Sequence, residues 1–540
     1  MSAAGVGTDK ASVSVIHSGP KASNAFDMNS TLVCGGYLVT HVDGHDQAIV
    51  IQDGAVLVRD SLIAEIGKFS DLAYRHQGVP ILGSQGHVVC PGFVNAHHHV
   101  GLTPLQLGSP DLPLELWIVR RIAARAVDYY LDTMYSAFEM VESGVTTVQH
   151  LHNRVPRPAS RVLDAAANVI RAYQDIGMRV SYSFGIRDQN RIVYEADDAF
   201  LKRLPLDLAS LAKAYLAEQT FELDELLAIF EALHAKFDKE ERVKIQLAPT
   251  NLQWCSDTAI VRTAEMARKY GVPMHMHLVE TSFQKEYARR RTGTTAIRHL
   301  HALGTLGPDM TLGHGVWLVE DDIRVVAETN TSICHNCSSN LRLRSGVAAL
   351  NAFRNAGVQV ALGIDEAGLN DDRDMLQEMR LVLRLHRTPG LDEREVPTCT
   401  QVFQMATEGG AATTPFAGRI GTVEVGRAAD LVLFRRDQLE FPYLSSDVPV
   451  VDALVQRARS SGVDTVMVAG KVILQNGLFT RVNKKEILDT LARELRKPPT
   501  EGDLRSRDLG IRLLAEARRF YDGYIGELGR ESFYKPSSRI

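Results

Sequence analysis

The stretch PGFVNAHHHVGL, residues 91–102, places three consecutive histidines directly after a short apolar run that begins at Val88. Side chains alternate faces along a β-strand, so we expect His97 and His99 to share one face while His98 points away. Two imidazoles spaced two residues apart on one strand form a compact chelating pair. The stretch therefore predicts a strand whose end carries a metal-binding pair.

Short apolar segments of this kind recur between residues 88 and 418, separated by long stretches with the apolar spacing of helices. In order they are VVCPGFV, TTVQHL, RVSYSFGI, RVKIQLAP, PMHMHL, MTLGHGV, NTSICH and VQVALGID. Strands that alternate with helices in this way predict an α/β fold, the (β/α)8 or TIM barrel. In such a barrel the carboxyl ends of all the strands face one active-site mouth.

Chemically active side chains follow five of these segments, at the expected mouth. They are His97 and His99 after the first strand, His277 and Glu280 after the fifth, His314 after the sixth, His335 after the seventh and Asp365 after the eighth. A single histidine at a strand end is weak evidence, because most such residues are structural, but this many together indicate a site. Three imidazoles and a carboxylate that leave a position open for water are typical of a catalytic metal site.

The two ends of the chain differ in pattern from the middle. Residues 31–87 and 419–480 contain short apolar alternations punctuated by Gly and Asp-Gly, which predict antiparallel hairpins. We expect both ends to build one small β-sandwich domain, into which the barrel of residues 88–418 is inserted. Residues 481–540 have helical spacing and predict a helical C-terminal extension, which either contacts another subunit or covers the barrel of its own subunit.

Composition limits the partners and the compartment. The chain has 540 residues, 45% hydrophobic and 23% charged, with a formal net charge of −5. This balance argues against nucleic acid or a membrane surface as the partner, and no apolar run reaches the ~18 residues of a membrane span. We expect a small-molecule substrate and a homo-oligomer, either dimer or tetramer. Residues 1–30 are rich in Ala, Ser and Gly and lack an apolar core segment, which predicts a disordered N-terminus without a signal peptide and a cytoplasmic protein.

The six cysteines are too sparse for a disulfide scaffold, so we expect reduced thiols. Cys334 and Cys337 form a C-x-x-C pair, but no second pair at similar spacing accompanies them, as structural zinc would require. The prediction is ordinary packing at a strand end, with a metal or redox role as the alternative.

Several motifs occur in a fixed order along the chain: PGFVNAHHH, SGVTTV, HMHLVET, LGHGV, SSNLRLRSGVAAL, LGIDEAGLNDDRDM and GTVEVGRAADLVL. In this order and spacing the sequence resembles the amidohydrolase superfamily over residues 31–477. The branch it resembles holds triazine hydrolases, guanine deaminase-like enzymes and S-adenosylhomocysteine or methylthioadenosine deaminases. The motifs are highly specific for fold and metal chemistry, and much less specific for substrate.

The resemblance implies a site with one divalent metal ion, and N/O ligands suit zinc or iron, of which we favour zinc. The implied ligands are His97, His99, His277 and Asp365. Glu280 would act as the proton shuttle, His314 would polarise or orient the substrate, and Asp365 would also accept the proton of water. Binuclear members need a carboxylated lysine at the end of the fourth strand, but that end reads QLAPTN and Lys244 lies too early to reach.

The residues that we expect at the substrate are Gln106, His150, Asn251, Trp254 and His335, with structural roles as the alternative for His150 and Trp254. Nucleoside-deaminase members usually carry a histidine after the proline of the fourth strand and an arginine soon after the first metal pair. Here Thr250, Asn251 and Gln106 occupy the corresponding segments. These neutral groups, with Trp254 as a stacking face, favour a flat, uncharged aromatic or heteroaromatic nitrogen compound over a nucleoside.

The segment after the third strand, residues 186–222, is much longer than usual and is expected to cap the pocket. It could reverse the preference for an uncharged ligand by bringing Arg187, Asp188 or Arg191 over the mouth.

The predicted function is therefore a metal-dependent hydrolase of a non-peptide C–N bond in a small, flat nitrogen compound. The alternatives are a deaminase of a purine or nucleoside and a dechlorinating triazine-type hydrolase. A catalytically silent binding barrel is the remaining alternative, and Glu280 argues against it, because a binding module gains nothing from an acid beside an open metal position.

Overall fold

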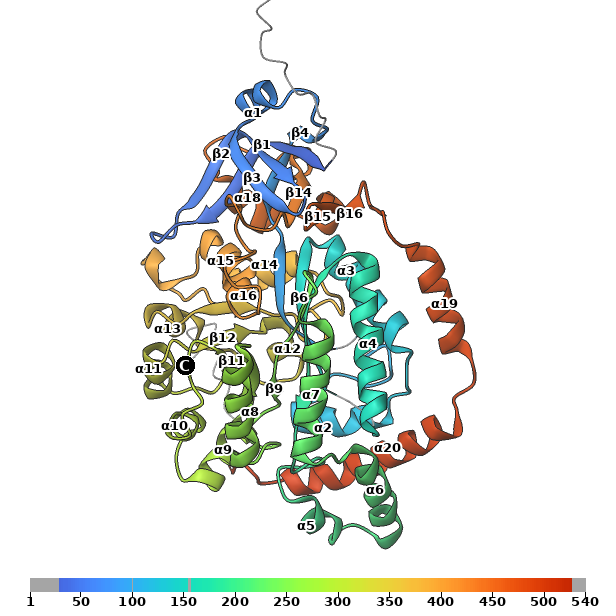
Figure 1. Ribbon diagram of the computed structural model, residues 1–540. Helices are drawn as coiled ribbons and strands as arrows, with labels where there is room; N and C mark the ends of the chain where they lie inside the picture. The colour runs from blue at the N-terminus through green and yellow to red at the C-terminus, as the bar shows by residue number, and fades with distance from the viewer. Residues whose placement is uncertain (1–28, 100, 154–156, 527–540) are drawn as a thin grey trace, which may run out of the picture.

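The computed structural model describes residues 29–99, 101–153 and 157–526 (Figure 1). The predicted disordered N-terminus, apart from its last two residues, lies outside the described residues, as does the end of the predicted C-terminal extension. Among the described residues, no helix is both long enough and apolar enough to cross a membrane.

Strands from both ends of the chain form one eight-stranded sheet, at the top of Figure 1. The N-terminal half supplies β1 (Ser30–Val42), β2 (Ala48–Arg59), β3 (Leu62–Lys68) and β4 (Ile81–Pro91), and the C-terminal half supplies β14 (Leu431–Arg435), β15 (Val463–Val468), β16 (Lys471–Gln475) and β17 (Leu478–Phe479). The order is β17-β16-β15-β14-β4-β1-β2-β3, so the two halves meet where β14 pairs antiparallel with β4. All strands are hydrogen-bonded into a single sheet, rather than into the two facing sheets of the predicted sandwich.

The middle of the chain forms the barrel. Its strands are β5 (Phe93–His98), β6 (Val145–His152), β7 (Arg179–Ile186), β8 (Val243–Ile245) with the short β9 (Ala248–Pro249), β10 (Met274–Leu278), β11 (Met310–His314), β12 (Ser332–His335) and β13 (Val360–Leu362). Neighbouring strands pair in parallel within two half-sheets, β5 to β8 and β10 to β13. Parallel bridges His98–Asp365 and Leu247–Met274 join the halves into a closed ring. The predicted (β/α)8 fold is confirmed.

Helices cover the outside of the barrel (Figure 1). They include α3 (Tyr129–Glu142), α4 (Ala159–Ile176), α7 (Leu223–Phe237), α8 (Asp257–Tyr270), α10 (Ala296–Ala302), α11 (Glu320–Glu328), α13 (Leu350–Asn355), α14 (Met375–Leu385), α15 (Cys399–Ala406) and α16 (Glu408–Ala412). Helix α8 illustrates how the sequence sets their ends. The Ser256 side chain accepts from the Ala259 N–H, and Gly271 ends the helix at φ 63°. The helix face that packs against the barrel buries small residues, including Ala259, Ala264 and Ala267.

Further helices lie at the mouth of the barrel or beside the sheet. Those at the mouth are α2 (Leu114–Arg120), the 3-10 turn η1 (Arg121–Ala123), α5 (Asp197–Leu201), α6 (Leu206–Gln219), α9 (Ser282–Thr292) and α12 (Cys337–Arg342). The remaining ones are α1 (Phe69–Arg75), η2 (Glu393–Glu395), α17 (Arg436–Glu440), α18 (Val450–Arg457) and η3 (Ser460–Gly462).

The C-terminal extension contributes α19 (Lys484–Arg496) and α20 (Glu501–Tyr521). In Figure 1 the two red helices run down the side of the barrel and across its lower end. Residues of α20 share one apolar cluster with η1 and with the long segment after β7, through Leu513, Ile122, Val193 and Leu208. Of the two predicted roles for the extension, the described part covers the barrel of its own chain.

A buried ion pair joins the barrel to the sheet. Arg179, at the start of β7, donates from Nε and Nη2 to the two carboxylate oxygens of Asp430, each at 2.9 Å. Both side chains are buried, and Asp430 also accepts from the Ala469 N–H at 2.7 Å. One carboxylate therefore fixes three segments of the chain at the amino end of the barrel strands.

Candidate active site

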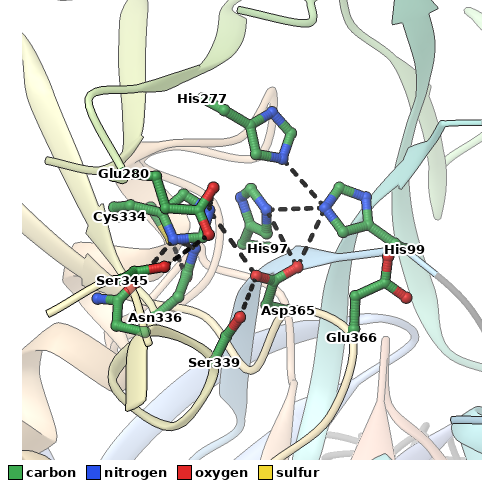
Figure 2. Close-up of polar contacts among 12 residues, drawn as sticks. His97, His99, His277, Glu280, Cys334, Asn336, Ser339, Ser345, Asp365 and Glu366 are labelled. Carbon is green, nitrogen blue, oxygen red and sulfur yellow. Dashed lines mark hydrogen bonds and ion pairs between the residues drawn. The ribbon is translucent and has the colours of Figure 1, made fainter. Parts of the chain in front are cut away.

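Three histidines and one aspartate converge at the mouth of the barrel (Figure 2). His97 and His99 lie at the end of β5, and their Nε2 atoms are 3.0 Å apart. The Nε2 of His277, from β10, is 3.1 Å from that of His99. Oδ1 of Asp365, just after β13, lies 3.1 Å from the same His99 nitrogen and 3.6 Å from Nε2 of His97. The structure thus brings together all four residues predicted as metal ligands.

The hydrogen bonds behind this cluster fix the direction of its lone pairs. Nδ1 of His99 donates to the Leu151 carbonyl at 2.6 Å, and Nδ1 of His277 donates to the Thr250 carbonyl at 2.9 Å. Each ring therefore directs its Nε2 toward the other ring and toward Asp365, where a shared proton or a metal ion can lie between them. Lone pairs that face each other at about 3 Å repel unless a cation lies between them. Imidazole nitrogens with one carboxylate match the ligand set of zinc and of related divalent ions.

His97 has its own supporting contact. Its Nδ1 lies 2.8 Å from Nε2 of His275, which lies one layer deeper on β10. His98 turns away as predicted, with Nε2 3.2 Å from the Ser136 hydroxyl. Close approach of His97 to the loop before Asp365 requires a glycine, since a Cβ on Gly363 would lie 2.5 Å from Cβ of His97.

Two of the candidate residues adopt left-handed backbone conformations. His314 has φ 73° and Asp365 has φ 62°, a region that non-glycine residues rarely occupy and that concentrates at functional sites.

Oδ2 of Asp365 accepts from the Ser339 hydroxyl at 2.6 Å. Burial would raise the pKa of Asp365, but the hydrogen bond and charge of His99 outweigh it, so the net shift is downward and the carboxylate stays ionised.

The surroundings of Glu280 shift its pKa in the direction opposite to that of Asp365. Its carboxyl group is buried beside the cluster, and Oε2 lies 3.7 Å from Nε2 of His314. Burial, with the nearby carboxylates of Asp365 and Glu115, raises the pKa of Glu280 well above its ordinary value. The site therefore holds one carboxyl group whose pKa is lowered and one whose pKa is raised, which is the pattern of a base and an acid.

His314 lies between these two carboxyl groups. Its Nε2 is 3.7 Å from Oδ2 of Asp365 and equally far from Glu280, while its Nδ1 donates to Oδ1 of Asn340 at 2.8 Å. Lys244, the residue position considered for a bridging carboxylate, donates to the Asp238 carbonyl outside the barrel. The geometry agrees with a site for one metal ion.

A narrow cavity of about 70 Å³, called here the catalytic cavity, opens against the cluster. Its walls include His99, Trp117, Arg121, Arg187, Asn251, Trp254, Glu280 and Asp365. The guanidinium of Arg187 lies 4.4 Å from the centre of the Trp254 ring, and Arg121 forms an ion pair with Glu366. Of the alternatives left open for the segment after the third strand, the one in which Arg187 reaches the mouth is therefore the one found. Arg187 follows β7 directly, and Arg121 belongs to η1, whose fold the sequence did not predict.

Three residues that were predicted to contact the substrate do not line the catalytic cavity. Gln106 is exposed and closes a turn, accepting from the Thr103 N–H at 2.8 Å and donating to the Tyr135 hydroxyl, so it does not line the catalytic cavity. His335 is buried with Nε2 2.9 Å from Nε2 of His386 and is likewise absent from these walls. His150 lines a neighbouring cavity and bonds to the Tyr173 hydroxyl.

The other two residues of the segment 186–222 that could have reached the mouth are held away from it. Asp188 accepts from the Ser256 hydroxyl at 2.6 Å, and Arg191 pairs with Asp197 at 3.5 Å. Only Arg187 enters the wall of the catalytic cavity among these three.

The six cysteines are all buried and none forms a disulfide. Cys337 lies in a second cluster with His335 and His386, where the three ligand atoms are within 4.8 Å of one another. Cys334 donates to Oδ1 of Asn336 at 3.4 Å, so the two cysteines of the C-x-x-C pair have separate surroundings.

Several residues of the site carry no role in the sequence interpretation. They are Glu115, Arg121, Ser339, Asn340 and Ser345. Three of these belong to the motif SSNLRLRSG after β12, and Ser345 donates to Oε1 of Glu280 at 3.3 Å (Figure 2). A polar run at the end of a barrel strand was the available signal.

Comparisons with known proteins agree with this geometry. The model of the amidohydrolase family matches residues 88–473. A 5-methylthioadenosine/S-adenosylhomocysteine deaminase of Pyrococcus furiosus is 30% identical over 452 residues, 83% of this chain and 96% of the relative. A 5'-deoxyadenosine deaminase of Methanothermobacter thermautotrophicus is 28% identical over 444 residues, 81% of this chain and 93% of the relative.

Solved structures show the same fold. An adenosine deaminase of Xanthomonas campestris with bound zinc has a TM-score of 0.71 at 25% identity, covering 86% of this chain and 97% of its own. The atrazine chlorohydrolase of Arthrobacter aurescens complexed with zinc has a TM-score of 0.74 at 21% identity, covering 86% of this chain and 99% of its own. The resemblance inferred from the motifs is confirmed, and the chain belongs to the amidohydrolase family.

Proposed function

We propose that this protein hydrolyses the bond between a heteroaromatic ring carbon and an amino nitrogen, releasing ammonia or an amine. The observation that carries the proposal is the position of two carboxyl groups, Asp365 and Glu280, on either side of His314 at one narrow cavity, in surroundings that shift their pKa values in opposite directions. The family acts on C–N bonds other than peptide bonds, and the relatives named above deaminate adenosine-type compounds.

His97, His99, His277 and Asp365 would hold one divalent ion, which we propose is zinc. Such an ion acts as a Lewis acid that makes water nucleophilic near neutral pH. Two of the similar structures contain zinc, and the ligand set of this chain fits it.

The protein's own residues then carry the protons. Asp365 accepts a proton from the attacking water, whose oxygen bonds to the ring carbon. Glu280, protonated beforehand, delivers a proton to the substrate nitrogen, so that the C–N bond breaks with a neutral leaving group. His314, between the two carboxyl groups, is placed to hydrogen-bond the substrate while the tetrahedral carbon forms. The ring carbon ends as a carbonyl.

The aromatic walls suit a flat ring. Trp117 and Trp254 both line the catalytic cavity, and aromatic contact contributes about 0.5–1.5 kcal/mol beyond area burial. Arg187 on Trp254 places a cation in the wall, so the argument against nucleosides from an uncharged pocket no longer holds. The proposed substrate class is therefore a heteroaromatic amine, with or without a substituent.

The test is product release by zinc-loaded enzyme from adenosine, guanine, melamine and a chlorotriazine. Ammonia from at least one amine, absent with Glu280→Gln, is the expected result. Release of chloride alone would replace the proposal with the dechlorinating alternative. Release of neither product would leave the silent binding barrel as the better description.

A further inference from the structure

A second buried carboxyl group lies behind the catalytic acid. Glu115, on α2, is buried, and its Oε1 accepts hydrogen bonds from the hydroxyl of Thr281 and, at 3.1 Å, from the hydroxyl of Tyr194. It is absent from the walls of the catalytic cavity, so it is not placed to contact a substrate there. Burying a carboxyl group costs free energy, which hydrogen bonds offset. What Glu115 does in this structure is fix its two hydroxyl donors.

Thr281 connects Glu115 to the catalytic acid, because it directly follows Glu280 in the chain. Its hydroxyl also caps α9, accepting from the Gln284 N–H at 3.2 Å. The side chain of Gln284 in turn accepts from the Glu280 N–H at 3.0 Å. A proton donor must lie within hydrogen-bond reach of the atom that it protonates, and an error of about 1 Å can cost about 10²-fold in rate. The anchor of Thr281 therefore bears on where Glu280 lies.

Tyr194 connects the same carboxyl group to the C-terminal extension. Its backbone N–H donates to the hydroxyl of Tyr521, at the end of α20, at 3.1 Å, and the two rings pack edge to face with centres 5.4 Å apart. The Tyr521 ring also packs edge to face on Phe283, in the first turn of α9, again at 5.4 Å. Helix α20 therefore contacts both Tyr194 and the helix that Thr281 caps.

Helix α20 lies outside the part of the chain that the family model matches, which ends at position 473. In Figure 1 it crosses the lower end of the barrel beside α2, the helix that carries Glu115. Gly510 of α20 packs so closely on η1, just after α2, that a Cβ there would lie 2.6 Å from the Ala123 nitrogen. The extension is thus fixed against the elements that surround Glu115.

We propose that Glu115, Thr281 and Tyr194 form a positioning network that holds Glu280 for proton transfer, and that α20 belongs to it through Tyr521. The proposal rests on the proposed function, because Glu280 is the acid of that reaction. Glu115 acts through Thr281 and is therefore a positioning residue. The C-terminal extension becomes a part of the catalytic apparatus rather than a cover of the barrel.

The test compares Glu115→Leu with Glu115→Gln on the amine that the wild type deaminates fastest. Both variants remove the same charge near Glu280, but only glutamine keeps an oxygen that accepts from Thr281 and Tyr194. With each variant at its own pH optimum, we expect kcat of Glu115→Leu to be about tenfold or more below that of Glu115→Gln, with similar KM and zinc content. A general loss of structure would lower the zinc content as well.

Two further variants test the network if Glu115→Leu does not fold. Tyr194→Phe removes one of the two donors to Glu115, and Tyr521→Leu removes the contact from α20. Both should lower kcat with little change in KM. The matched control is Tyr270→Phe, which removes a hydroxyl that donates to Glu231 between α8 and α7 and should keep the wild-type kcat.

Equal kcat in Glu115→Leu and Glu115→Gln, or a wild-type kcat in Tyr194→Phe, would overturn the proposal while leaving the proposed function intact. A wild-type kcat in Tyr521→Leu alone would remove α20 from the network. If no compound releases ammonia, the proposed function fails, and hydrogen exchange of the amides of residues 280–284 decides the network separately. Faster exchange in Glu115→Leu than in Glu115→Gln would support it, and equal exchange would refute it.

Discussion

The hydroxyl of Ser345 donates a hydrogen bond of 3.3 Å to Oε1 of Glu280, a carboxyl group buried at the edge of the metal-ligand cluster. This contact stabilises the charged form of Glu280, while burial and the neighbouring Asp365 and Glu115 carboxylates oppose it. Burial and the two carboxylates outweigh the hydrogen bond from Ser345, so the pKa of Glu280 lies well above its ordinary value. The shift therefore favours the protonated form of Glu280, which the mechanism needs.

Changing these two neighbours should move the alkaline limb of the pH–rate profile in opposite directions. Activity requires protonated Glu280 and falls as pH rises through its pKa. Ser345→Ala removes a stabiliser of the carboxylate, so the pKa rises and the limb moves to higher pH. Glu115→Gln removes a nearby negative charge, so the pKa falls and the limb moves to lower pH. The measurement is kcat/KM against pH for each variant.

Ser210→Ala is the control for loss of a hydroxyl, because Ser210 lies on the exposed face of α6 and bonds only to its own helix at Leu206 among the contacts found. Its profile should match the wild type. Shifts of the same sign in Ser345→Ala and Glu115→Gln would exclude Glu280 as the group behind the alkaline limb.

Metal content gives a prediction about the ligands. Purified protein should hold about one zinc ion per chain, and His97→Ala or Asp365→Ala should empty the site, since an open catalytic site has few ligands to spare. Lys244→Ala should keep the ion, because Lys244 points outside the barrel. Elemental analysis of the wild type and of these three variants measures their zinc content. A second ion that disappears in Cys337→Ser would instead show that the cluster of His335, Cys337 and His386 also binds metal.

Glu280→Gln separates chemistry from metal binding. The amide keeps the size of the side chain and can still accept from Ser345, but it has no acidic proton. We expect metal content near the wild type with kcat lowered by about 10²-fold or more. Steady-state kinetics on the best substrate, with elemental analysis of the same preparation, measures both. Activity close to the wild type would assign the proton transfer to another group.

The strand pattern predicts the core of the site well. Alternation along β5 predicts that His97 and His99 share a face and that His98 turns away, and strand ends in a closed parallel barrel must meet at one mouth. These are local or topological rules. They hold whatever the loops do, which is why all four proposed ligands lie together.

The loops could not be predicted in the same way. Gln106 closes a turn with Thr103, and nothing in the sequence distinguishes that local bond from a contact with substrate. Arg121 reaches the catalytic cavity because η1 packs against α20, nearly 400 residues later, through Gly510. Such long-range packing has no signature in residue periodicity. The substrate contacts were therefore the least accurate part of the sequence interpretation.

The ion pair between Arg179 and Asp430 should dominate the attachment of the sheet to the barrel. Removing one partner of a buried pair leaves an uncompensated charge, which costs about 3–5 kcal/mol. Arg179→Met should therefore lower the free energy of unfolding by about that amount, and the double variant Arg179→Met with Asp430→Leu should recover part of it, because no charge then remains buried. The control is Lys485→Met, which breaks the exposed pair with Asp489 and should leave the free energy of unfolding close to that of the wild type, because water screens exposed charges. Urea unfolding of zinc-loaded protein followed by circular dichroism measures all three. A loss for Arg179→Met no larger than that for Lys485→Met would mean that the apolar contacts between sheet and barrel, rather than this carboxylate, hold the two together.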